Sequence, residues 1–274
     1  MQPSPSTIAD MNFLRSIGFK PSVVLPDGFP FLLPAVESLT ELAFDTPVTF
    51  LVGENGSGKS TVLEAIAVGM QCPSIGRADA NFDDLLLPAK RLAEHLTFSQ
   101  SRRARRRLFF RAEDAIGFTL RLKSTMAELR DMESHFDETL EGEGRGRAMG
   151  SVRGQRVALV SRYGEDPDSR SHGEWFLHMF KERVLENGLY LMDEPETPLS
   201  PIHQLSLLSL IRERVKEGCQ FIIATHSPIL MALPDSTIFS FDSYPVSQIA
   251  WEDVEHVAIT RAFLNDPESF LRHL

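Results

Sequence analysis

The stretch "TPVTFLVGENGSGKSTVLEAIAVGM", Thr46 to Met70, decides the fold of this chain. Its first part is a short apolar run that ends in glycine, which predicts a buried strand. Its last part has apolar residues at helical spacing between Val62 and Ala67. Between the two stands a loop with the pattern G-x-x-x-x-G-K-[ST]. The stretch therefore predicts a strand, a glycine-rich loop and a helix in succession.

A loop of this composition is typical of a phosphate-binding site. Its glycines let the backbone curl so that N–H groups point inward, and the following helix N-terminus adds partial positive charge. Lys59 can reach the β- and γ-phosphates of a nucleotide, and the Ser60 hydroxyl can bind Mg²⁺. The expected nucleotide-binding residues are Gly53, Glu54, Asn55, Gly56, Ser57, Gly58, Lys59, Ser60 and Thr61.

A second stretch, "GLYLMDEPETPLSP" from Gly188 to Pro201, sets two acids at the end of an apolar run. A buried strand has no use for adjacent unpaired charges, so these acids need a positive partner. The hydrated Mg²⁺ of a bound nucleotide supplies one. We expect Asp193 to hold the metal through water and Glu194 to accept a proton from the attacking water.

Four motifs occur in an order that resembles the ABC-type ATPases: "GENGSGKST", "SHGEWF", "LYLMDEPETPLS" and "ATHSP". "DEPE" resembles the soluble branch with the OLD-, RecF- and SMC-like proteins more than the transporter-like "DEPT". The resemblance implies that ATP is the nucleotide and that His226 is the switch histidine that contacts the γ-phosphate. It makes Glu194, His226 and Lys59 the expected catalytic set.

The resemblance also assigns a signature to "RSHGEW", Arg170 to Trp175, where the family usually has Leu-Ser-Gly-Gly-Gln. Ser171 and Gly173 match this signature, whereas His172 and Glu174 depart from it. In the family this loop binds the γ-phosphate held by the opposite subunit. The signature residues expected to act across an interface are Ser171, Gly173 and Glu174, and they imply an ATP-bound homodimer.

Two further family features are open at the level of sequence. A glutamine that senses Mg²⁺ usually follows the strand predicted in "RLFFRAED", and Glu113 is the nearest polar candidate for this metal-binding role. An adenine-stacking aromatic is expected near the N-terminus. The four phenylalanines that compete for that role are Phe19, Phe29, Phe31 and Phe44.

Apolar strands alternate with helical patterns, which predicts an α/β domain of ABC-ATPase type around a largely parallel sheet. We expect an antiparallel N-terminal β subdomain and an inserted, mainly helical subdomain over residues 72–170, all within a single domain, 1–274. The glycine- and arginine-rich stretch from Glu141 to Gly154 is interpreted as a loop. No heptads persist in the insertion, so no long coiled coil is expected there.

The 274 residues carry a net charge of −10, which argues against broad non-specific binding to nucleic acid. One exception is "SRRARRRLFFR", Ser101 to Arg111, with six arginines. We interpret Arg102–Arg107, at the mouth of the insertion, either as a solvated end paired with acids such as Glu94 and Glu113 or as a weak nucleic-acid contact. No apolar run is long enough to span a membrane. The two cysteines cannot form a disulfide framework, so the expected location is cytoplasmic.

The leading functional hypothesis is ATP hydrolysis by an ATP-sandwich homodimer. Hydrolysis would drive a conformational change in a soluble complex that contains a separate effector protein. The family branch suggests DNA repair or defence against phage. Two alternatives are kept: a nucleotide-binding subunit of an ABC transporter, and an ATP-gated binding module with little hydrolysis.

Overall fold

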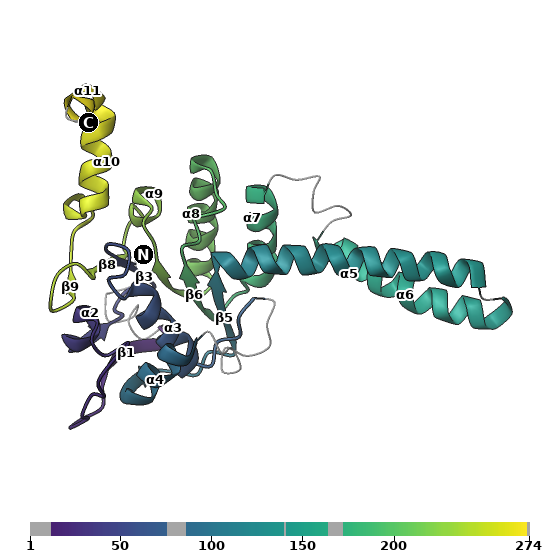
Figure 1. Cartoon of the computed structure of the whole chain (residues 1–274), viewed down its shortest axis with the longest axis horizontal. Helices are drawn as coiled ribbons and strands as arrows, with labels where there is room; N and C mark the ends of the chain where they lie inside the picture. Colours follow the sequence, from purple (N-terminus) through teal and green to yellow (C-terminus); the bar gives the residue numbers. More distant parts are fainter. Residues whose placement is uncertain (1–11, 76–85, 140, 164–171, 273–274) are drawn as a thin grey trace.

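The computed structural model describes residues 12–75, 86–139, 141–163 and 172–272 (Figure 1). A body with two β-sheets carries a long helical hairpin that projects to one side, and a C-terminal arm of two helices that rises from the body. In the described part of the chain, no helix is long and apolar enough to cross a membrane.

The larger sheet has six strands in the order β5-β6-β7-β3-β8-β9. All neighbours pair in parallel except β8 and β9, which are antiparallel. The strands are β3 (Val48–Val52), β5 (Arg106–Arg111), β6 (Gly188–Asp193), β7 (Gln220–Ala224), β8 (Thr237–Ser240) and β9 (Ser247–Gln248). The predicted α/β class with a largely parallel sheet is confirmed.

The smaller sheet has three strands in the order β2-β1-β4, and both pairings are antiparallel. They are β1 (Leu14–Phe19), β2 (Glu41–Ala43) and β4 (Leu96–Gln100). This sheet is the antiparallel N-terminal β subdomain that the sequence predicted, although its third strand comes from well beyond the N-terminal segment.

Helices cover both faces of the larger sheet. Alternate residues of β3 show this division: Val48, Phe50 and Val52 pack with α7 and α8, whereas Leu51 packs with α3 and the smaller sheet. The helices of the body and the arm are α2 (Pro34–Glu37), α3 (Lys59–Gly69), α4 (Leu87–His95), α7 (His172–Arg183), α8 (Pro201–Lys216), α9 (Pro228–Met231), the 3₁₀ turn η3 (Trp251–Asp253), α10 (Glu255–Asn265) and α11 (Pro267–Leu271). Strands buried on both faces explain the near-continuous apolar runs in the sequence.

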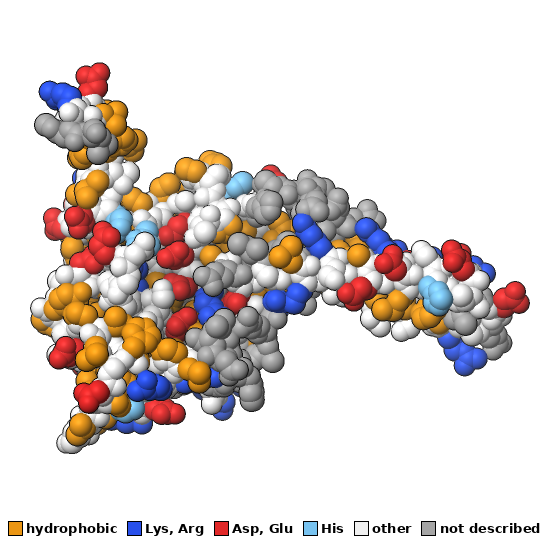
Figure 2. All heavy atoms as spheres, in the orientation of Figure 1, with side chains coloured by type: hydrophobic (Ala, Val, Ile, Leu, Met, Phe, Trp, Pro, Cys, Tyr) orange, Lys and Arg blue, Asp and Glu red, His pale blue; other side chains and the backbone are white. Residues whose placement is uncertain are grey.

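The projecting hairpin consists of α5 (Ala112–Thr139) and α6 (Gly142–Tyr163), which pack against each other. The expectation of a loop over Glu141–Gly154 is therefore wrong, because Gly142 to Gly154 lie in α6. Figure 2 shows acidic and basic side chains interspersed along this hairpin. Arg156 pairs with Glu133 at 3.1 Å across the two helices, and contacts between the helices support α6 although glycine has a low helix propensity.

In the interval where no long coiled coil was expected for lack of persistent heptads, α5 and α6 form a long pair of helices. The buried apolar residues of the hairpin include Leu122, Met126 and Leu129, spaced four and three residues apart on one face of α5, and Val152 of α6. The interval 72–170 also contains β4 and β5, which belong to the two sheets. The boundaries of the inserted subdomain stay a prediction.

One side chain, Gln220 at the start of β7, joins the two sheets. Its Oε1 accepts hydrogen bonds from the backbone N–H groups of Phe13 and Leu14, each at 2.9 Å. Its Nε2 donates to the carbonyl oxygen of Leu14 at 2.8 Å. Gln220 is 1% exposed, so this amide replaces water as the partner of three buried backbone groups.

We expect Gln220→Leu to lower the free energy of unfolding by about 3 kcal/mol, because two buried N–H groups lose their acceptor while the side-chain volume is kept. Urea denaturation followed by circular dichroism measures this change. The matched control is Gln248→Leu on the exposed strand β9, which we expect to change stability by less than about 0.5 kcal/mol. Equal effects of the two substitutions would contradict the role given to Gln220.

Candidate functional site

The glycine-rich loop connects the buried strand β3 to α3, as predicted. Gly53, Gly56 and Gly58 have φ angles of 146°, 81° and 103°, in the left-handed region where side chains are strained. At Gly53 a Cβ atom would also lie 2.8 Å from Oδ1 of Asp242. The loop conformation therefore requires glycine at these positions.

Lys59 begins α3 and is 5% exposed. Its Nζ donates hydrogen bonds to the carbonyl oxygens of Gly53 and Glu54, each at 2.8 Å. Burial lowers the pKa of Lys59, and the nearby carboxylates of Asp242 and Asp193 oppose that shift. A partly desolvated ammonium curled over the loop is well placed to attract phosphate oxygens.

Ser60 and Asp193 connect the loop to strand β6. The Ser60 hydroxyl donates a hydrogen bond of 3.0 Å to Oδ1 of Asp193. Burial raises the pKa of Asp193 to about 6, although the hydrogen bond from Ser60 lowers it. A carboxylate with such an unfavourable environment is one that a bound cation would stabilise.

Glu194 lies one residue beyond β6 and has a φ angle of +47°, which is uncommon for a residue with a side chain. Its backbone N–H donates to the carbonyl oxygen of Ala224 at 2.9 Å. Its side chain is 47% exposed and its Oε1 lies 3.9 Å from Nε2 of His226. Backbone strain at such a position is a feature of functional sites.

His226 follows strand β7 and completes this group. Its backbone N–H donates to Oε1 of Glu196 at 2.8 Å. Burial lowers the pKa of His226, with further contributions from Lys59 and His256. Burial also raises the pKa of Glu196. Sequence reasoning assigned Glu196 no role beyond the "DEPE" pattern, yet its side chain holds the backbone that presents His226.

Two other residues at this edge of the sheet were missed by sequence reasoning. Asp242, just after β8, accepts a hydrogen bond of 2.7 Å from the backbone N–H of Glu54 and so holds the loop. An acid directly after a parallel strand was a signal that could have found it. His256, in α10, lies with its Nε2 3.3 Å from Nδ1 of His226. Nothing local in the sequence marks this histidine.

The side chain of Glu113, the tentative metal ligand, lies outside the described part of the chain. Arg111 lies beside Asp193, because the two residues pair in the register of β5 and β6. Arg111 forms ion pairs with Asp114 at 2.9 Å and Glu64 at 3.5 Å. The end of β5, where the family resemblance predicted a glutamine, therefore carries Arg111, which is paired with acids.

The signature is described only in part, since Ser171 lies outside the described residues. Gly173 is buried in the first turn of α7, where a Cβ atom would lie 2.5 Å from Nδ1 of His203. Glu174 is exposed. Glycine at 173 thus permits a close approach between α7 and α8, in addition to the signature role that the resemblance implies.

The residues present fit a magnesium nucleotide. Within the described ranges, no three carboxylate, histidine or cysteine side chains come together as a metal site. Ser60 offers a direct oxygen ligand and Asp193 one through water, and Mg²⁺ commonly takes few protein ligands and completes its shell with phosphate and water. Ser57, in the loop, has a buried hydroxyl without a hydrogen-bond partner, which phosphate could satisfy.

The arginine run lies away from the glycine-rich loop. Arg102–Arg107 precede or begin β5, at the opposite edge of the sheet from the glycine-rich loop, and not at the mouth of the hairpin. Arg102 stacks on Phe13 at 4.2 Å from the ring centre, and Arg106 pairs with Glu186 at 3.2 Å. Glu186, which precedes β6, is thus an acid that pairs with this run, and the side chain of the predicted partner Glu113 lies outside the described part of the chain.

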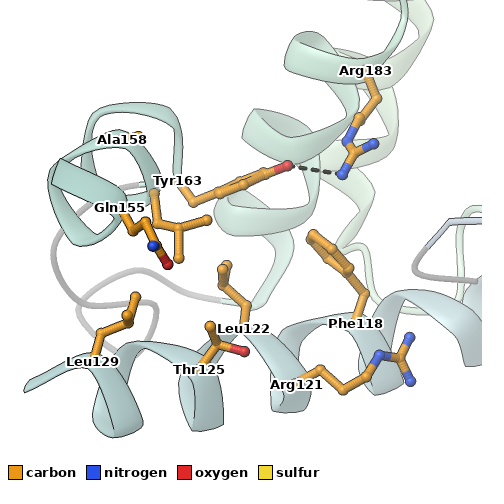
Figure 3. Close-up of a pocket in the computed structure, with 10 residues that line it drawn as sticks. Phe118, Arg121, Leu122, Thr125, Leu129, Gln155, Ala158, Tyr163 and Arg183 are labelled. Carbon is orange, nitrogen blue, oxygen red and sulfur yellow. Dashed lines mark hydrogen bonds between the residues drawn. The ribbon is translucent and has the colours of Figure 1, made fainter. Parts of the chain in front are cut away.

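A cavity of about 590 Å³ lies at the root of the hairpin between α5, α6 and α7 (Figure 3). Phe118 and Leu122 line it from α5, and the hydroxyl of Tyr163 accepts a hydrogen bond of 2.9 Å from Arg183 of α7. This contact ties the end of α6 to the helix that carries Gly173 and Glu174. The cavity holds none of the residues predicted for the nucleotide site.

Comparison with known proteins gives one family match. A family model described as an AAA domain matches residues 32–182. Among curated proteins, the arabinose import ATP-binding protein of Escherichia coli O6:H1 is 25% identical over 244 residues, which cover 84% of this chain and 44% of the relative. The protein of the same name from Shigella flexneri gives the same identity and coverage. This chain thus spans less than half the length of the curated relatives it matches.

Solved structures with a similar arrangement include a head domain of Smc from Pyrococcus furiosus, with an extended coiled coil and bound to a domain of ScpA. It covers 91% of this chain and 99% of its own length, with a TM-score of 0.44 and 14% identity. A nucleotide-free ATP-binding cassette from an ABC transporter covers 93% of this chain and 96% of its own length, with a TM-score of 0.45 and 14% identity.

The raised pKa of Asp193 gives a test in nucleotide-free protein with EDTA. Between the unfolded pKa of 3.8 and the folded value of about 6, the folded state binds more protons than the unfolded state, so stability falls as the pH rises. We expect Asp193→Asn to remove this cost and to raise the Tm at pH 8 by about 5 °C. The gain should shrink to about half at pH 5. A gain that is independent of pH in calorimetry would refute the assigned cause.

Proposed function

From the membership of the chain in the AAA domain family whose model matches residues 32–182, we propose that the chain binds ATP with Mg²⁺ and hydrolyses it. The chain is of the ABC type that its motifs resemble. One observation carries the proposal. The Ser60 hydroxyl, from the glycine-rich loop, donates to Asp193 at 3.0 Å, and Glu194 and His226 lie beside this pair at the same edge of the sheet.

In this proposal each side chain has a separate task. Lys59 neutralises charge on the β- and γ-phosphates, and Ser60 and Asp193 hold Mg²⁺. The bound magnesium nucleotide supplies a polarised γ-phosphoryl group. Glu194, partly exposed and strained toward the site, takes a proton from the attacking water. His226 supports the γ-phosphate through its Nε2, which is buried without a hydrogen-bond partner among the described residues.

We propose further that two copies of the chain close around two ATP molecules. Ser171, Gly173 and Glu174 then act on the nucleotide held by the other copy. Two observations support this step: the site lies at an edge of the sheet, and Glu194 stays 47% exposed there. A second copy would exclude water from that edge and strengthen the electrostatic interactions in the site.

The finer biological role belongs to the same proposal. We place the ATPase in the cytoplasm, where closure of the homodimer drives a separate effector protein in DNA repair or phage defence. Arg103 and Arg105 are exposed and line one surface pocket of about 310 Å³, so they are the residues that support a weak nucleic-acid contact through Arg102–Arg107.

A transporter subunit is the second candidate function, because the name of the Escherichia coli relative is that of an import ATP-binding protein. The signature with Glu174 and the "DEPE" sequence favour the first candidate. Affinity purification of Glu194→Gln protein with ATP separates the two, since a transporter subunit co-purifies with a membrane-spanning partner. An ATP-gated module with little hydrolysis would instead show binding without turnover.

Catalysis is tested by two substitutions. We expect Glu194→Gln to retain ATP binding and to hydrolyse ATP about 10²–10⁴ times more slowly, because it loses the general base. Lys59→Ala should lose binding as well. Phosphate release and fluorescent-nucleotide titration measure the two properties. The control Glu138→Gln, an exposed change on α5, should match the wild type. Wild-type turnover by Glu194→Gln would remove Glu194 from the catalytic set.

Dimerisation is tested with the same slow variant. We expect Glu194→Gln with ATP and Mg²⁺ to elute as a dimer in size-exclusion chromatography with light scattering, and the double variant with Ser171→Arg to stay monomeric. Ser134→Arg on α5 is the matched control, because it adds the same side chain far from the site. A monomer for Glu194→Gln under saturating ATP contradicts the sandwich mechanism.

A further inference from the structure

The two ring nitrogens of His226 have different surroundings. Nδ1 lies 3.3 Å from Nε2 of His256, and the two rings meet edge to face, with centroids 4.9 Å apart. Nε2 is buried, makes no hydrogen bond within the described part of the chain, and lies 3.9 Å from Oε1 of Glu194. One nitrogen of His226 therefore faces a second histidine, and the other faces the catalytic edge.

Only one hydrogen can lie between the two rings. Burial, Lys59 and His256 together lower the pKa of His226, so this ring is neutral near pH 7. A neutral imidazole carries its hydrogen on one nitrogen and accepts on the other. Either His226 donates through Nδ1, or His256 donates through Nε2 and the hydrogen of His226 is on its Nε2.

The carboxylates near the two rings favour the second arrangement. Oε1 of Glu54 lies 3.9 Å from Nε2 of His256, just as Glu194 lies 3.9 Å from Nε2 of His226. If His256 donates, Nε2 of His226 carries a hydrogen and presents its partial positive charge to Glu194. If His226 donates instead, its Nε2 presents a lone pair to Glu194, which is repulsive. Nε2 of His256 is used by the contact between the rings in both cases.

Two other charged groups near His226 make no hydrogen bond to its ring in the described part of the chain. Glu196 binds the backbone N–H of His226 rather than the ring. Lys59 is held by the carbonyl oxygens of Gly53 and Glu54. Its positive charge lowers the pKa of His226 and so keeps the ring neutral, but it offers no acceptor to either ring.

The position of His256 is fixed by its neighbours in the C-terminal arm. Val254 and Val257, on either side of it, are 2% and 3% exposed and pack into the core of the body. The indole N–H of Trp251 donates to the carbonyl oxygen of Pro228 at 3.1 Å, in the short helix that follows His226. Figure 1 shows the base of α10 beside this part of the body, while the rest of the arm extends away.

We propose that His256 is a positioning residue, which donates its Nε2 hydrogen to Nδ1 of His226 and fixes the His226 tautomer whose Nε2–H faces the catalytic edge. For phosphate this tautomer is the useful one, because an N–H group can donate to an anionic oxygen and a lone pair cannot. That consequence rests on the proposed ATPase function, whereas the hydrogen bond itself does not. The arm thus contributes to the chemistry without touching the reacting atoms.

The direct test is the tautomer of His226, read from side-chain ¹⁵N chemical shifts and ¹⁵N–¹H couplings in the nucleotide-free protein near pH 7.5. A His226→Gln variant identifies the signals. We expect the wild type to hold its hydrogen on Nε2, and His256→Ala to show a mixture of both tautomers. The control His135→Ala, an exposed change on α5, should leave the tautomer unchanged. A wild-type ring protonated on Nδ1 overturns the proposal, as does an unchanged tautomer in His256→Ala.

The second test measures turnover. We expect His256→Ala to lower kcat about tenfold with little change in the KM for ATP, as loss of an outer partner of a functional histidine commonly does. His256→Gln keeps a donor and should restore most of the activity. If the substitutions at His256 change the KM for ATP and leave kcat unaltered, they have only damaged the local structure, and this result contradicts a positioning role. If no variant hydrolyses ATP, the proposed function fails, and the tautomer measurement still decides the histidine contact.

Discussion

The parallel register of β3, β7 and β6 is the constraint on which the site depends. Leu51 pairs with Ala224, and Ala224 pairs in turn with Asp193, so the three strands end level with one another. The chain that leaves them forms the glycine-rich loop, the two acids and His226. A slip of one residue in β6 would move Asp193 by about 3.3 Å and turn its side chain to the other face. The hydrogen bond to Ser60 would then be lost.

Several unfavourable features are concentrated at this edge. The pKa of Lys59 is lowered and that of Asp193 is raised, so both ions are less stable here than in water. Glu194 adds a backbone conformation that costs about 1–3 kcal/mol. The strands behind the edge offset these terms, since every residue of β3 and β7 is buried. Unfavourable local features of this kind, within an otherwise consistent core, are typical of a functional site.

How much could be predicted from the sequence depends on the range of the interaction concerned. The resemblance to ABC-type ATPases and the α/β class are confirmed. They could be predicted because the motif with Lys59 and the acids at 193 and 194 are local patterns beside strands. Helix α6 was missed, since its glycines oppose a helix and only contact with α5 stabilises it. The roles of Gln220 and His256 were missed because both act on segments far away in the chain. No periodicity marks a side chain whose partner is set by the tertiary fold.

The direction of β5 explains why the arginine run and the nucleotide site are separate. This strand begins at Arg106 and ends at Arg111, so one run of arginines is divided between opposite edges of the sheet. The two ends are about 17 Å apart at 3.3 Å per residue. Exposed charges at that distance are largely screened, because the Debye length at physiological salt is about 8 Å. Arg111 therefore belongs electrostatically to the acids around Asp193, and Arg102–Arg107 do not. If two copies closed over the nucleotide edge, as proposed above, the larger arginine group at the start of β5 would lie away from the closed edge.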